Sequence, residues 1–528
     1  MYTYLMYRLK ELAIILILVG FLAYLPSFFG NFVWDDEDFV YANKYVQNFQ
    51  LDKFWTENAI AGRGKMSNYY RPIQFSMYSI LYKVAGPNPF VYHLAGVILH
   101  ITAAVLVFIV LSTITKISFV AFLTALLFLI HPIQTESVSY ISGHSDPLYV
   151  LFFFLSIFFF LKRNKRLLYK VLSVCFFILS LLSKELALIL PGIIMLIMLF
   201  KRHPDENQDP DIVKKTHLHL DSGFRRNDVL FIGLFFLIDL LYLISRFTFL
   251  KFSDISQYWI GNPYGEHFFI RLATFFRTFF TSLGLLFFPI DLFMERDFTV
   301  PIQHSLFNPW TAGFFILNAG IIVILYLNKR QATKHYPLFF YLCFLISLIP
   351  YVGIFLLNGI YYEHFLYLPM IFFWASMLSF LSGLISKKIL KYIVGIILIL
   401  YLFRSYVRQW DWIDNERFYR QTLSHAPKSI RIINGLGMTL GEKNNCQEAI
   451  TVYKQAIMID KNVPNLYHNI ANCYVSLGNN KEAETYYLTA LKINPKFTFS
   501  AVNLYRLYLQ TNQKDKATQI ANTFSLLH

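Results

Sequence analysis

Residues 12–38 read LAIILILVGFLAYLPSFFGNFVWDDED, and this stretch decides the fold. Its first part, Leu12–Phe29, is predominantly apolar and long enough to cross a hydrocarbon core of about 30 Å as a helix. It exceeds a typical signal-peptide core and lacks a small-residue cleavage site, so we interpret it as a retained first membrane span. The acids that follow it are then expected outside the bilayer.

The composition excludes a single water-soluble globule. Of the 528 residues, 56% are hydrophobic and only 15% are charged, whereas average soluble domains carry about 25% charged residues. The apolar residues gather in twelve blocks, which predict an all-α, polytopic membrane protein. The blocks cover residues 12–29, 90–114, 117–130, 146–161, 167–183, 186–200, 229–246, 268–290, 311–327, 336–357, 364–385 and 389–407.

The basic residues indicate how the chain is threaded. The net charge is +15, but many cations lie in short clusters beside apolar blocks, as in Lys162–Arg166, which is typical of cytoplasmic loops. We therefore expect contacts with membrane lipids and no nucleic-acid partner. We place the N-terminus in the cytoplasm. If all twelve blocks crossed the membrane, the clusters around Lys329 and Lys387 would then lie outside. The clusters around Lys201, Lys329 and Lys387 are all cytoplasmic only if one block after Lys201 does not cross.

Block 268–290 is the one that we expect not to cross. Arg271 and Arg277 lie in its first half, where a lipid-exposed charge costs on the order of 2.5–3.5 kcal/mol. About eleven spans remain. They place the gap 30–89 outside, together with everything after the last block.

The C-terminal tail, residues 409–528, has a repeat of 34 residues. Equivalent pairs at that spacing are Leu436 and Ile470, Gly437 and Ala471, Ala449 and Ala483, Tyr453 and Tyr487, and Ala456 and Ala490. Small residues at this period are the signature of tetratricopeptide (TPR) repeats. The pattern predicts an α-solenoid with a half-repeat at 411–427, repeats at 430–463 and 464–497, and a degenerate repeat at 498–528. The alternative is an ordinary helical bundle.

The four cysteines predict no disulfide framework. Cys175 and Cys343 lie inside apolar blocks, and Cys446 and Cys473 lie in the tail. Their positions leave the redox compartment open.

The acids Asp35, Asp36, Glu37 and Asp38 are the first candidates for chemistry. Four adjacent carboxylates repel one another, which favours a raised proton affinity for one of them or a bound cation. A carboxylate at the end of a span is suited to accept a proton from an acceptor hydroxyl while a lipid-borne donor approaches. A solvated acidic turn or a helix N-cap is the alternative.

Other polar motifs fall on the same predicted side of the membrane. Together they predict a pocket for a phosphate-linked sugar, with arginine as the best partner for phosphate oxygens. Each also has a structural interpretation: a helix end, a local ion pair, or an arginine extended to lipid headgroups. The candidate residues are Arg71, His131, Glu136, Asp146, Lys184, Glu363 and His364.

Taken in order, these motifs resemble a known family. FVWDD at 32–36, YRP at 70–72, HPIQTE at 131–136, Lys184-Glu185 and EHFLYLP at 363–369 precede the TPR units. The whole chain is similar to the transmembrane-and-TPR (TMTC) protein O-mannosyltransferases and their bacterial relatives, which have the GT-C fold. The resemblance implies a transmembrane glycosyltransferase domain over 1–408 and a TPR domain over 409–528.

The resemblance also implies an activity. Family members transfer a mannose-like sugar from a polyprenyl-phosphate carrier to Ser/Thr hydroxyls of proteins on the non-cytoplasmic face, with inversion. Asp35 and Asp36 correspond to the family's acid pair, one of them the base, and Arg271 corresponds to a phosphate ligand. Two departures stand out: His364 replaces an arginine in the late motif, and His144 replaces one before Asp146.

Several expectations follow for cofactors and partners. The donor is a lipid-linked sugar, the acceptor protein is recruited by the TPR domain, and Mg²⁺ or Mn²⁺ at the acidic segment is possible, although no ligand spacing demands a metal. We expect a bacterial inner-membrane protein with its TPR domain periplasmic or extracellular. The alternatives are transfer to a lipid or polysaccharide, and a non-catalytic TPR membrane scaffold.

Overall fold

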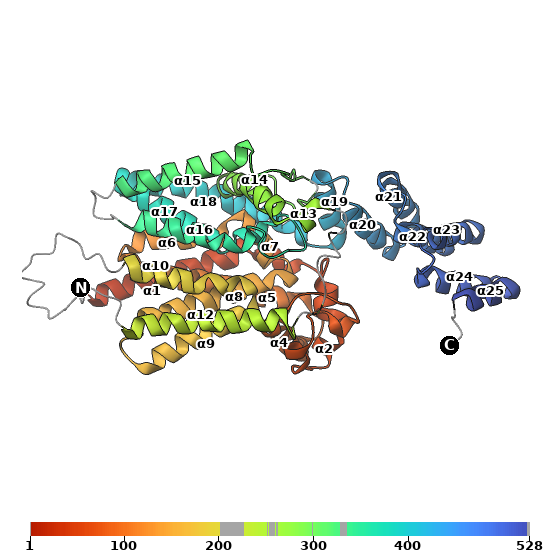
Figure 1. Ribbon diagram of the computed structural model, residues 1–528, viewed down its shortest axis with the longest axis horizontal. Helices are drawn as coiled ribbons and strands as arrows, with labels where there is room; N and C mark the ends of the chain where they lie inside the picture. The colour runs from red at the N-terminus through yellow and green to blue at the C-terminus, as the bar shows by residue number, and fades with distance from the viewer. Residues whose placement is uncertain are drawn as a thin grey trace, which may run out of the picture. The chain divides into compact units, whose positions relative to one another are not determined.

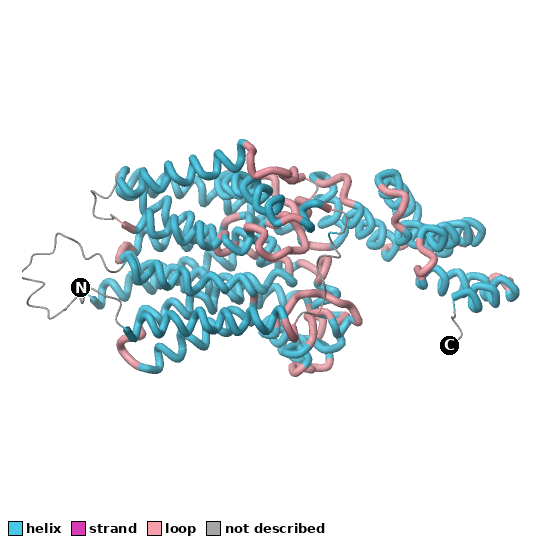
Figure 2. Tube along the Cα trace, in the orientation of Figure 1, coloured by secondary structure: helices cyan, strands magenta, loops and turns pink. Residues whose placement is uncertain are grey.

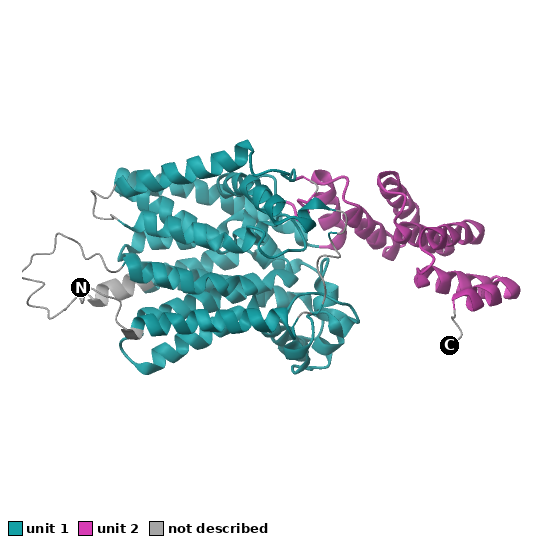
Figure 3. Cartoon of the chain, in the orientation of Figure 1, with its two compact units in different colours: residues 1–292, 300–413 teal, residues 293–299, 414–528 magenta. Residues whose placement is uncertain are grey.

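The computed structural model describes residues 2–200, 226–250, 252, 259, 262–297, 299–327 and 335–524. Within these residues it is helical throughout and contains no strand (Figure 2), which confirms the all-α prediction. The basic clusters at Lys201 and Lys329 lie outside the described residues. Contacts divide the chain into two compact units, Met1–Leu292 with Val300–Ile413, and Phe293–Thr299 with Asp414–His528 (Figure 3).

The first unit is a bundle of apolar helices, and each predicted block contains one of them. Most of them lie side by side along a common direction (Figure 1). They are α1 (Tyr2–Ala23), α5 (Pro89–Thr115), α6 (Ser118–Ile130), α8 (Ser145–Leu161), α9 (Leu167–Ser183), α10 (Leu190–Phe200), α12 (Arg226–Phe247), α14 (Phe268–Phe287), α15 (Pro309–Leu327), α16 (Tyr336–Ser347), α17 (Pro369–Leu384) and α18 (Lys387–Gln409).

Fewer of these helices qualify as membrane spans by length and composition. Among the described residues, six helices are long and apolar enough to cross a membrane, or seven if the bent pair Ser118–Ile130 and Pro132–Val138 is one span. Four further apolar helices are shorter. The chain is thus a multi-pass membrane protein, and the eleven-span topology stays a prediction.

Helix α14 is the element expected not to cross. By length and composition it passes as a span, with a hydropathy of 1.3, the lowest of the six. Arg271 donates to backbone carbonyl oxygens of Gly353, Tyr264 and Gly265, and Arg277 lies 4.1 Å from the centre of the Trp310 ring. Both charges thus have protein partners, and whether α14 crosses stays a prediction.

The gap 30–89 folds into an ordered helical cap at one end of the bundle, where α2 and α4 lie together (Figure 1). Its core contains Phe39, Phe54, Phe75 and Tyr78, each at most 4% exposed. Short helices also occur in the other loops. These short elements are η1 (Leu25–Phe29), η2 (Glu37–Tyr41), α2 (Lys44–Gln47), α3 (Lys53–Thr56), η3 (Ala61–Arg63), α4 (Pro72–Ala85), η4 (Pro132–Gln134), α7 (Thr135–Val138), η5 (Ile141–His144), η6 (Glu185–Ile189), α13 (Pro263–Glu266), η8 (Ile349–Tyr351), η9 (Glu363–Leu366) and η10 (Trp410–Trp412).

The second unit consists of helix pairs at the predicted period. Its helices are α19 (Asn415–His425), α20 (Ile430–Glu442), α21 (Cys446–Ile459), α22 (Pro464–Ser476), α23 (Asn480–Ile493), α24 (Thr498–Gln510) and α25 (Lys514–Phe524). The predicted repeats 430–463 and 464–497 each contain one pair, α20–α21 and α22–α23. The TPR prediction is therefore confirmed at the level of individual helices.

Small residues let the two helices of a repeat approach. A Cβ atom added at Gly437 on α20 would lie 2.4 Å from the Tyr453 ring on α21, and Tyr453 is only 2% exposed. Such a contact is too short to be tolerated without repacking. The second repeat has Ala471 and Tyr487 at the equivalent positions, both buried.

We predict that Gly437→Ala destabilises the TPR unit by about 1–3 kcal/mol, the usual effect of overpacking a core. The measurement is hydrogen–deuterium exchange of the amides of α20 and α21 in the full chain. Gly441→Ala on the same helix is the matched control, because its added Cβ would lie 3.8 Å from Cys473 Sγ, an ordinary contact. Equal protection in the two variants would contradict the packing argument.

Candidate active site

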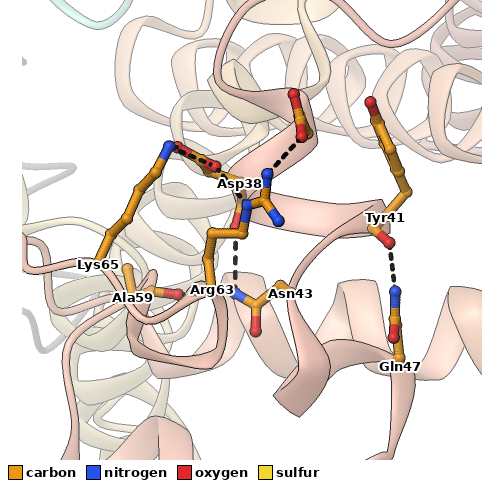
Figure 4. Close-up of polar contacts among 8 residues, drawn as sticks. Asp38, Tyr41, Asn43, Gln47, Ala59, Arg63 and Lys65 are labelled. Atoms are coloured by element: carbon orange, nitrogen blue, oxygen red, sulfur yellow. Dashed lines mark hydrogen bonds and ion pairs between the residues drawn. The ribbon is translucent and has the colours of Figure 1, made fainter. Parts of the chain in front are cut away.

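The acidic segment 35–38 follows α1 and η1 in the chain, and its last two acids form ion pairs within the cap. Figure 4 shows those of Asp38. Arg63 donates to Glu37 at 2.7 Å and to Asp38 at 3.3 Å. Lys65 Nζ lies 2.6 Å from an Asp38 oxygen. These pairs are largely exposed and contribute little stability. They assign Glu37 and Asp38 to the cap rather than to chemistry.

The same region of the cap is held by a buried amide. Asn43 donates to the backbone carbonyls of Asp38 at 3.2 Å and Ala59 at 3.1 Å, and Gln47 donates to the Tyr41 carbonyl (Figure 4). Asn43 also caps α2 by accepting from Tyr45 N–H. The segment after the acids is therefore fixed to the second half of the gap 30–89.

Asp36 is the buried member of the acidic segment, at 1% exposed. One carboxylate oxygen accepts from Ser142 N–H at 2.7 Å and Ser142 Oγ at 2.6 Å, and the other accepts from Val33 N–H at 2.9 Å. Burial raises the pKa of Asp36 to about 7, and the hydrogen bonds from Ser142 and Val33 oppose that rise. With three donors, Asp36 links the two loops and fixes the backbone around Asp35.

Asp35 is the half-buried neighbour of this anchored group. It follows Trp34, whose φ of 56° is unusual for a bulky residue and costs about 1–2 kcal/mol. The hydrogen bond from Val33 N–H to the Asp36 carboxylate spans this turn and stabilises it. Asp35 thus lies beside a fixed carboxylate, and part of its surface stays accessible.

A second layer of hydrogen bonds holds the Ser142 loop. Gln74 Nε2 on α4 donates to the Ser142 carbonyl at 2.9 Å and to Tyr78 Oη at 2.8 Å. Tyr78 Oη in turn donates to the Ile141 carbonyl at 2.5 Å. All of these groups are buried, so the position of Asp36 is fixed from both sides.

Lys184 and Asp146 form a buried ion pair, with Nζ 2.7 Å from a carboxylate oxygen and side chains 5% and 1% exposed. Asp146 also accepts from Ser137 Oγ at 3.3 Å. Removing one partner of such a pair typically costs 3–5 kcal/mol, because the other charge stays buried. The predicted residues Asp146 and Lys184 are thus brought together, from the starts of α8 and η6.

Glu136 and His364 form a second pair. Nδ1 of His364 lies 2.5 Å from Oε1 of Glu136, and His364 N–H donates to Oε2 at 3.1 Å. Because the carboxylate accepts at Nδ1, Nε2 is the ring nitrogen left to face a ligand. His364 is 22% exposed, whereas Glu136 is 2% exposed.

Arg71 completes the cationic group. Its guanidinium lies 4.5 Å from the centre of the Tyr69 ring, and its buried Nε has no hydrogen-bond partner among the described residues. Arg71 and Lys184 both lie within electrostatic range of His364. We name Arg71, Lys184 and His364 the basic cluster.

Sequence reasoning missed Arg246 at the end of α12. Its guanidinium donates to the Asn68 carbonyl at 2.7 Å and lies within electrostatic range of Glu185, as does Arg71. The sequence could have indicated it, because Arg246 is the last residue of the apolar block 229–246, at its predicted outer end. The sequence also does not single out Ser142, since nothing in it pairs this residue with Asp36.

The basic cluster and the acids lie at the same end of the bundle. Tyr78 is within electrostatic range of both Asp36 and Arg71. Tyr140 is within range of Asp35, Asp36 and Tyr69, the ring on which Arg71 stacks. The structure therefore brings together five predicted residues from distant motifs, besides the acid pair: Arg71, Glu136, Asp146, Lys184 and His364.

Three predicted residues have mainly structural contacts. His131 is fully buried and uses both ring nitrogens on the backbone, toward Leu286 O and Ile133 N–H. Glu363 is fully buried, 3.8 Å from the Arg408 guanidinium. Arg271 donates to three backbone carbonyls, as described above, so its role as a phosphate ligand stays a prediction.

The acidic segment does not fit a divalent metal. The oxygens of Asp36, Glu37 and Asp38 already accept from the protein's own donors. Within the described part of the chain, no group of three or more His, Cys, Asp or Glu side chains is arranged to hold a metal ion. No step below uses one.

Comparisons with known proteins agree with this architecture. Family models match residues 464–497 (Tetratricopeptide repeat) and 439–478 (TPR repeat). Among curated relatives, Protein O-mannosyl-transferase F38B6.6 of Caenorhabditis elegans is 27% identical over 85% of this chain and 62% of its own length. Human Protein O-mannosyl-transferases TMTC3 and TMTC4 are 23% and 25% identical over 93% and 82% of this chain.

These relatives are longer than this chain, which spans 56% of TMTC3 and 64% of TMTC4. The similarity nevertheless runs through both units, from the membrane bundle into the repeats. The homologues of this chain over most of its length are therefore TMTC-family protein O-mannosyl-transferases.

Proposed function

We propose that the chain is a glycosyltransferase that moves a mannose-like sugar from a polyprenyl-phosphate carrier to Ser/Thr hydroxyls of proteins on the non-cytoplasmic face of the membrane. The observation that carries the proposal is the grouping at one end of the bundle of a fixed acid pair, Asp35 and Asp36, with the basic cluster. The names of the relatives support the protein acceptor.

The reaction needs a base near the attacking hydroxyl and positive charge near the leaving phosphate. Asp35 takes the hydroxyl proton as the acceptor oxygen bonds to the anomeric carbon. The bond from that carbon to the phosphate oxygen breaks, and polyprenyl phosphate leaves with inversion. Asp36 holds the loop that positions Asp35, since its own oxygens are occupied.

The basic cluster suits the leaving phosphate. Arg71 has a buried Nε without a described partner, and Lys184, which pairs with Asp146, lies within electrostatic range of Arg71. Arginine binds phosphate oxygens in a fork geometry, and lysine binds them as a point charge. A lipid carrier brings its phosphate to the interface, where the ends of the helices present these groups.

The opposite orientation of the chain is disfavoured by the basic loops. Lys162, Arg163, Lys165 and Arg166 join α8 to α9, and Lys387 and Lys388 open α18. By the positive-inside rule these loops are cytoplasmic. Since Asp146 and Lys184 lie at the other ends of α8 and α9, the site is then non-cytoplasmic, and we infer a bacterial inner membrane with a periplasmic TPR unit that presents the acceptor.

We predict that Asp35→Asn lowers transfer of labelled sugar from a polyprenyl-phosphate donor by 10²–10⁴-fold, the usual contribution of a general base. The measurement is single-turnover transfer to envelope proteins by the purified full chain. The control is Glu37→Gln, which removes an exposed charge of the same segment that pairs with Arg63. Unchanged transfer by Asp35→Asn would contradict the assignment.

A separate measurement distinguishes a protein acceptor from a polysaccharide acceptor. Mass spectrometry of envelope glycopeptides, with and without the chain, is expected to show lost O-linked hexoses. A change in a surface polymer without any change in glycopeptides would instead favour a polysaccharide acceptor.

We predict that Ser142→Ala lowers kcat on the order of 10-fold with little change in donor KM, because one hydrogen bond to a charged group, worth about 1.5–3 kcal/mol, is lost from Asp36. Steady-state transfer kinetics provide the test. Ser145→Ala is the matched control, since Ser145 Oγ, three residues further on at the start of α8, is buried without a described partner. If both variants behaved alike, Asp36 would not depend on Ser142.

A further inference from the structure

The first helices of the TPR pairs carry few charges, unlike the second helices. Helix α22 contains no Asp, Glu, Lys or Arg, α24 contains only Arg506, and α20 has Arg431 and Glu442 near its two ends. The second helices α21, α23 and α25 carry two, four and three such residues. Because a helix of a small unit usually turns charged residues toward water, the accessible side of the first helices is unusual.

Asparagine side chains occupy that accessible side. On α22, Asn465, Asn469 and Asn472 are spaced i, i+4 and i+7, which places them on one face of the helix. Asn465 is exposed, and the other two are half-buried. Asn434 on α20 and Asn503 on α24 are half-buried as well. We name these five residues the amide row.

Hydrogen bonds join the amide row across three consecutive helix pairs. Asn469 Nδ2 donates to Asn434 Oδ1 at 2.9 Å, which links α22 to α20. Asn503 Nδ2 donates to Asn472 Oδ1 at 3.0 Å, which links α24 to α22. Since Asn469 and Asn472 are neighbours on α22, the amides form one continuous polar track along the repeats.

Two donors fix the orientation of Asn472. Its Oδ1 accepts from Tyr487 Oη on α23 at 2.5 Å as well as from Asn503. Its Nδ2 forms no hydrogen bond within the part of the chain that the structure describes, and the same holds for the side chain of the exposed Asn465. A side-chain amide offers two N–H donors and two acceptor lone pairs. The row therefore keeps oriented hydrogen-bonding groups for a ligand.

The spacing and chemistry of the amide row match an extended polypeptide. Packed helices lie about 8–10 Å apart, and an extended chain advances about 3.3 Å per residue. One step between first helices therefore spans about three residues of a bound chain. Each residue of that chain presents one main-chain donor and one acceptor, which an uncharged side-chain amide can pair in either sense.

We propose that the amide row binds an extended segment of the acceptor polypeptide through its main chain, with little dependence on its side chains. The inference rests on the proposed function in one respect, that proteins are the acceptors. It specifies which acceptors fit: segments that are not yet folded, or loops with a free main chain, because helices and sheets already use these groups. No consensus sequence around the modified serine or threonine is then expected.

The experiment measures the affinity of the purified full chain for a fluorescent peptide of Ala, Gly, Ser and Thr by anisotropy. About twelve residues are enough to follow the row across its three first helices. The peptide with the reversed sequence is expected to bind equally well, because its main chain is the same. An analogue with N-methylated main-chain amides is expected to lose binding, because its donors are removed.

Two variants test the row itself. Asn472→Asp keeps the oxygen that accepts from Tyr487 and Asn503 but replaces the N–H donors. We expect it to raise the Kd of the peptide about 3–10-fold, the effect of one lost hydrogen bond. Asn465→Ala is expected to act in the same direction, and it removes no described contact within the repeats. The charge-matched control is Asn480→Asp at the exposed start of α23, which should leave the Kd unchanged.

Three results would overturn the proposal: no binding by the native chain, equal binding of the N-methylated peptide, or loss of binding on sequence reversal. An unchanged Kd in Asn465→Ala would also overturn it, even if Asn472→Asp failed to accumulate.

Sugar transfer to protein acceptors separates this failure from failure of the proposed function. In the variants we expect a raised acceptor KM with unchanged kcat and donor KM. Transfer with an unchanged acceptor KM rejects the amide row only. Peptide binding that depends on the row, in a native chain that transfers no sugar, rejects the proposed function and leaves main-chain recognition supported.

Discussion

The three hydrogen bonds that the Asp36 carboxylate accepts are the constraint on which the rest of the site depends. Two come from Ser142 and one from Val33, and Ser142 lies 106 residues further along the chain. They join the cap that follows the first helix to the loop that precedes α8. A buried acid is costly unless its oxygens are satisfied, and here the same bonds that satisfy it also position Asp35. Structure and proposed chemistry therefore use adjacent carboxylates for different tasks.

The same division of tasks recurs among the cations. Arg63 and Lys65 form ion pairs with Glu37 and Asp38 in the cap. Arg271 donates hydrogen bonds to backbone carbonyls near α13. Arg71 and Lys184 instead both lie within electrostatic range of His364. Lys184 is paired with Asp146 and Nδ1 of His364 with Glu136, so part of the cluster's charge is already compensated. Arg71 Nε, which has no hydrogen-bond partner among the described residues, is a donor left for a phosphate oxygen.

Much of this arrangement could be predicted from the sequence, and the reasons are physical. A long apolar block predicts a helix, because in a bilayer the backbone must form its hydrogen bonds within the segment. Each of the twelve blocks coincides with a helix in the structure. The 34-residue period located the repeats because small residues such as Gly437 are needed where helices touch. Pairings between distant loops, such as Asp36 with Ser142, leave no periodic trace in the sequence. Arg271 is the opposite case. An arginine is a suitable phosphate ligand, but in the structure its guanidinium donates to nearby backbone carbonyls, which residue type alone does not predict.

The central claim is that the acid pair and the basic cluster form one site for a lipid-linked phosphate at the capped end of the bundle. A structure of the full chain in a lipid nanodisc with bound polyprenyl phosphate tests it most directly. We expect phosphate oxygens within hydrogen-bonding distance of Arg71 and Lys184, with the phosphate oxygen that would carry the sugar facing Asp35. Phosphate bound at the opposite end, beside Lys162 and Arg163, would contradict it.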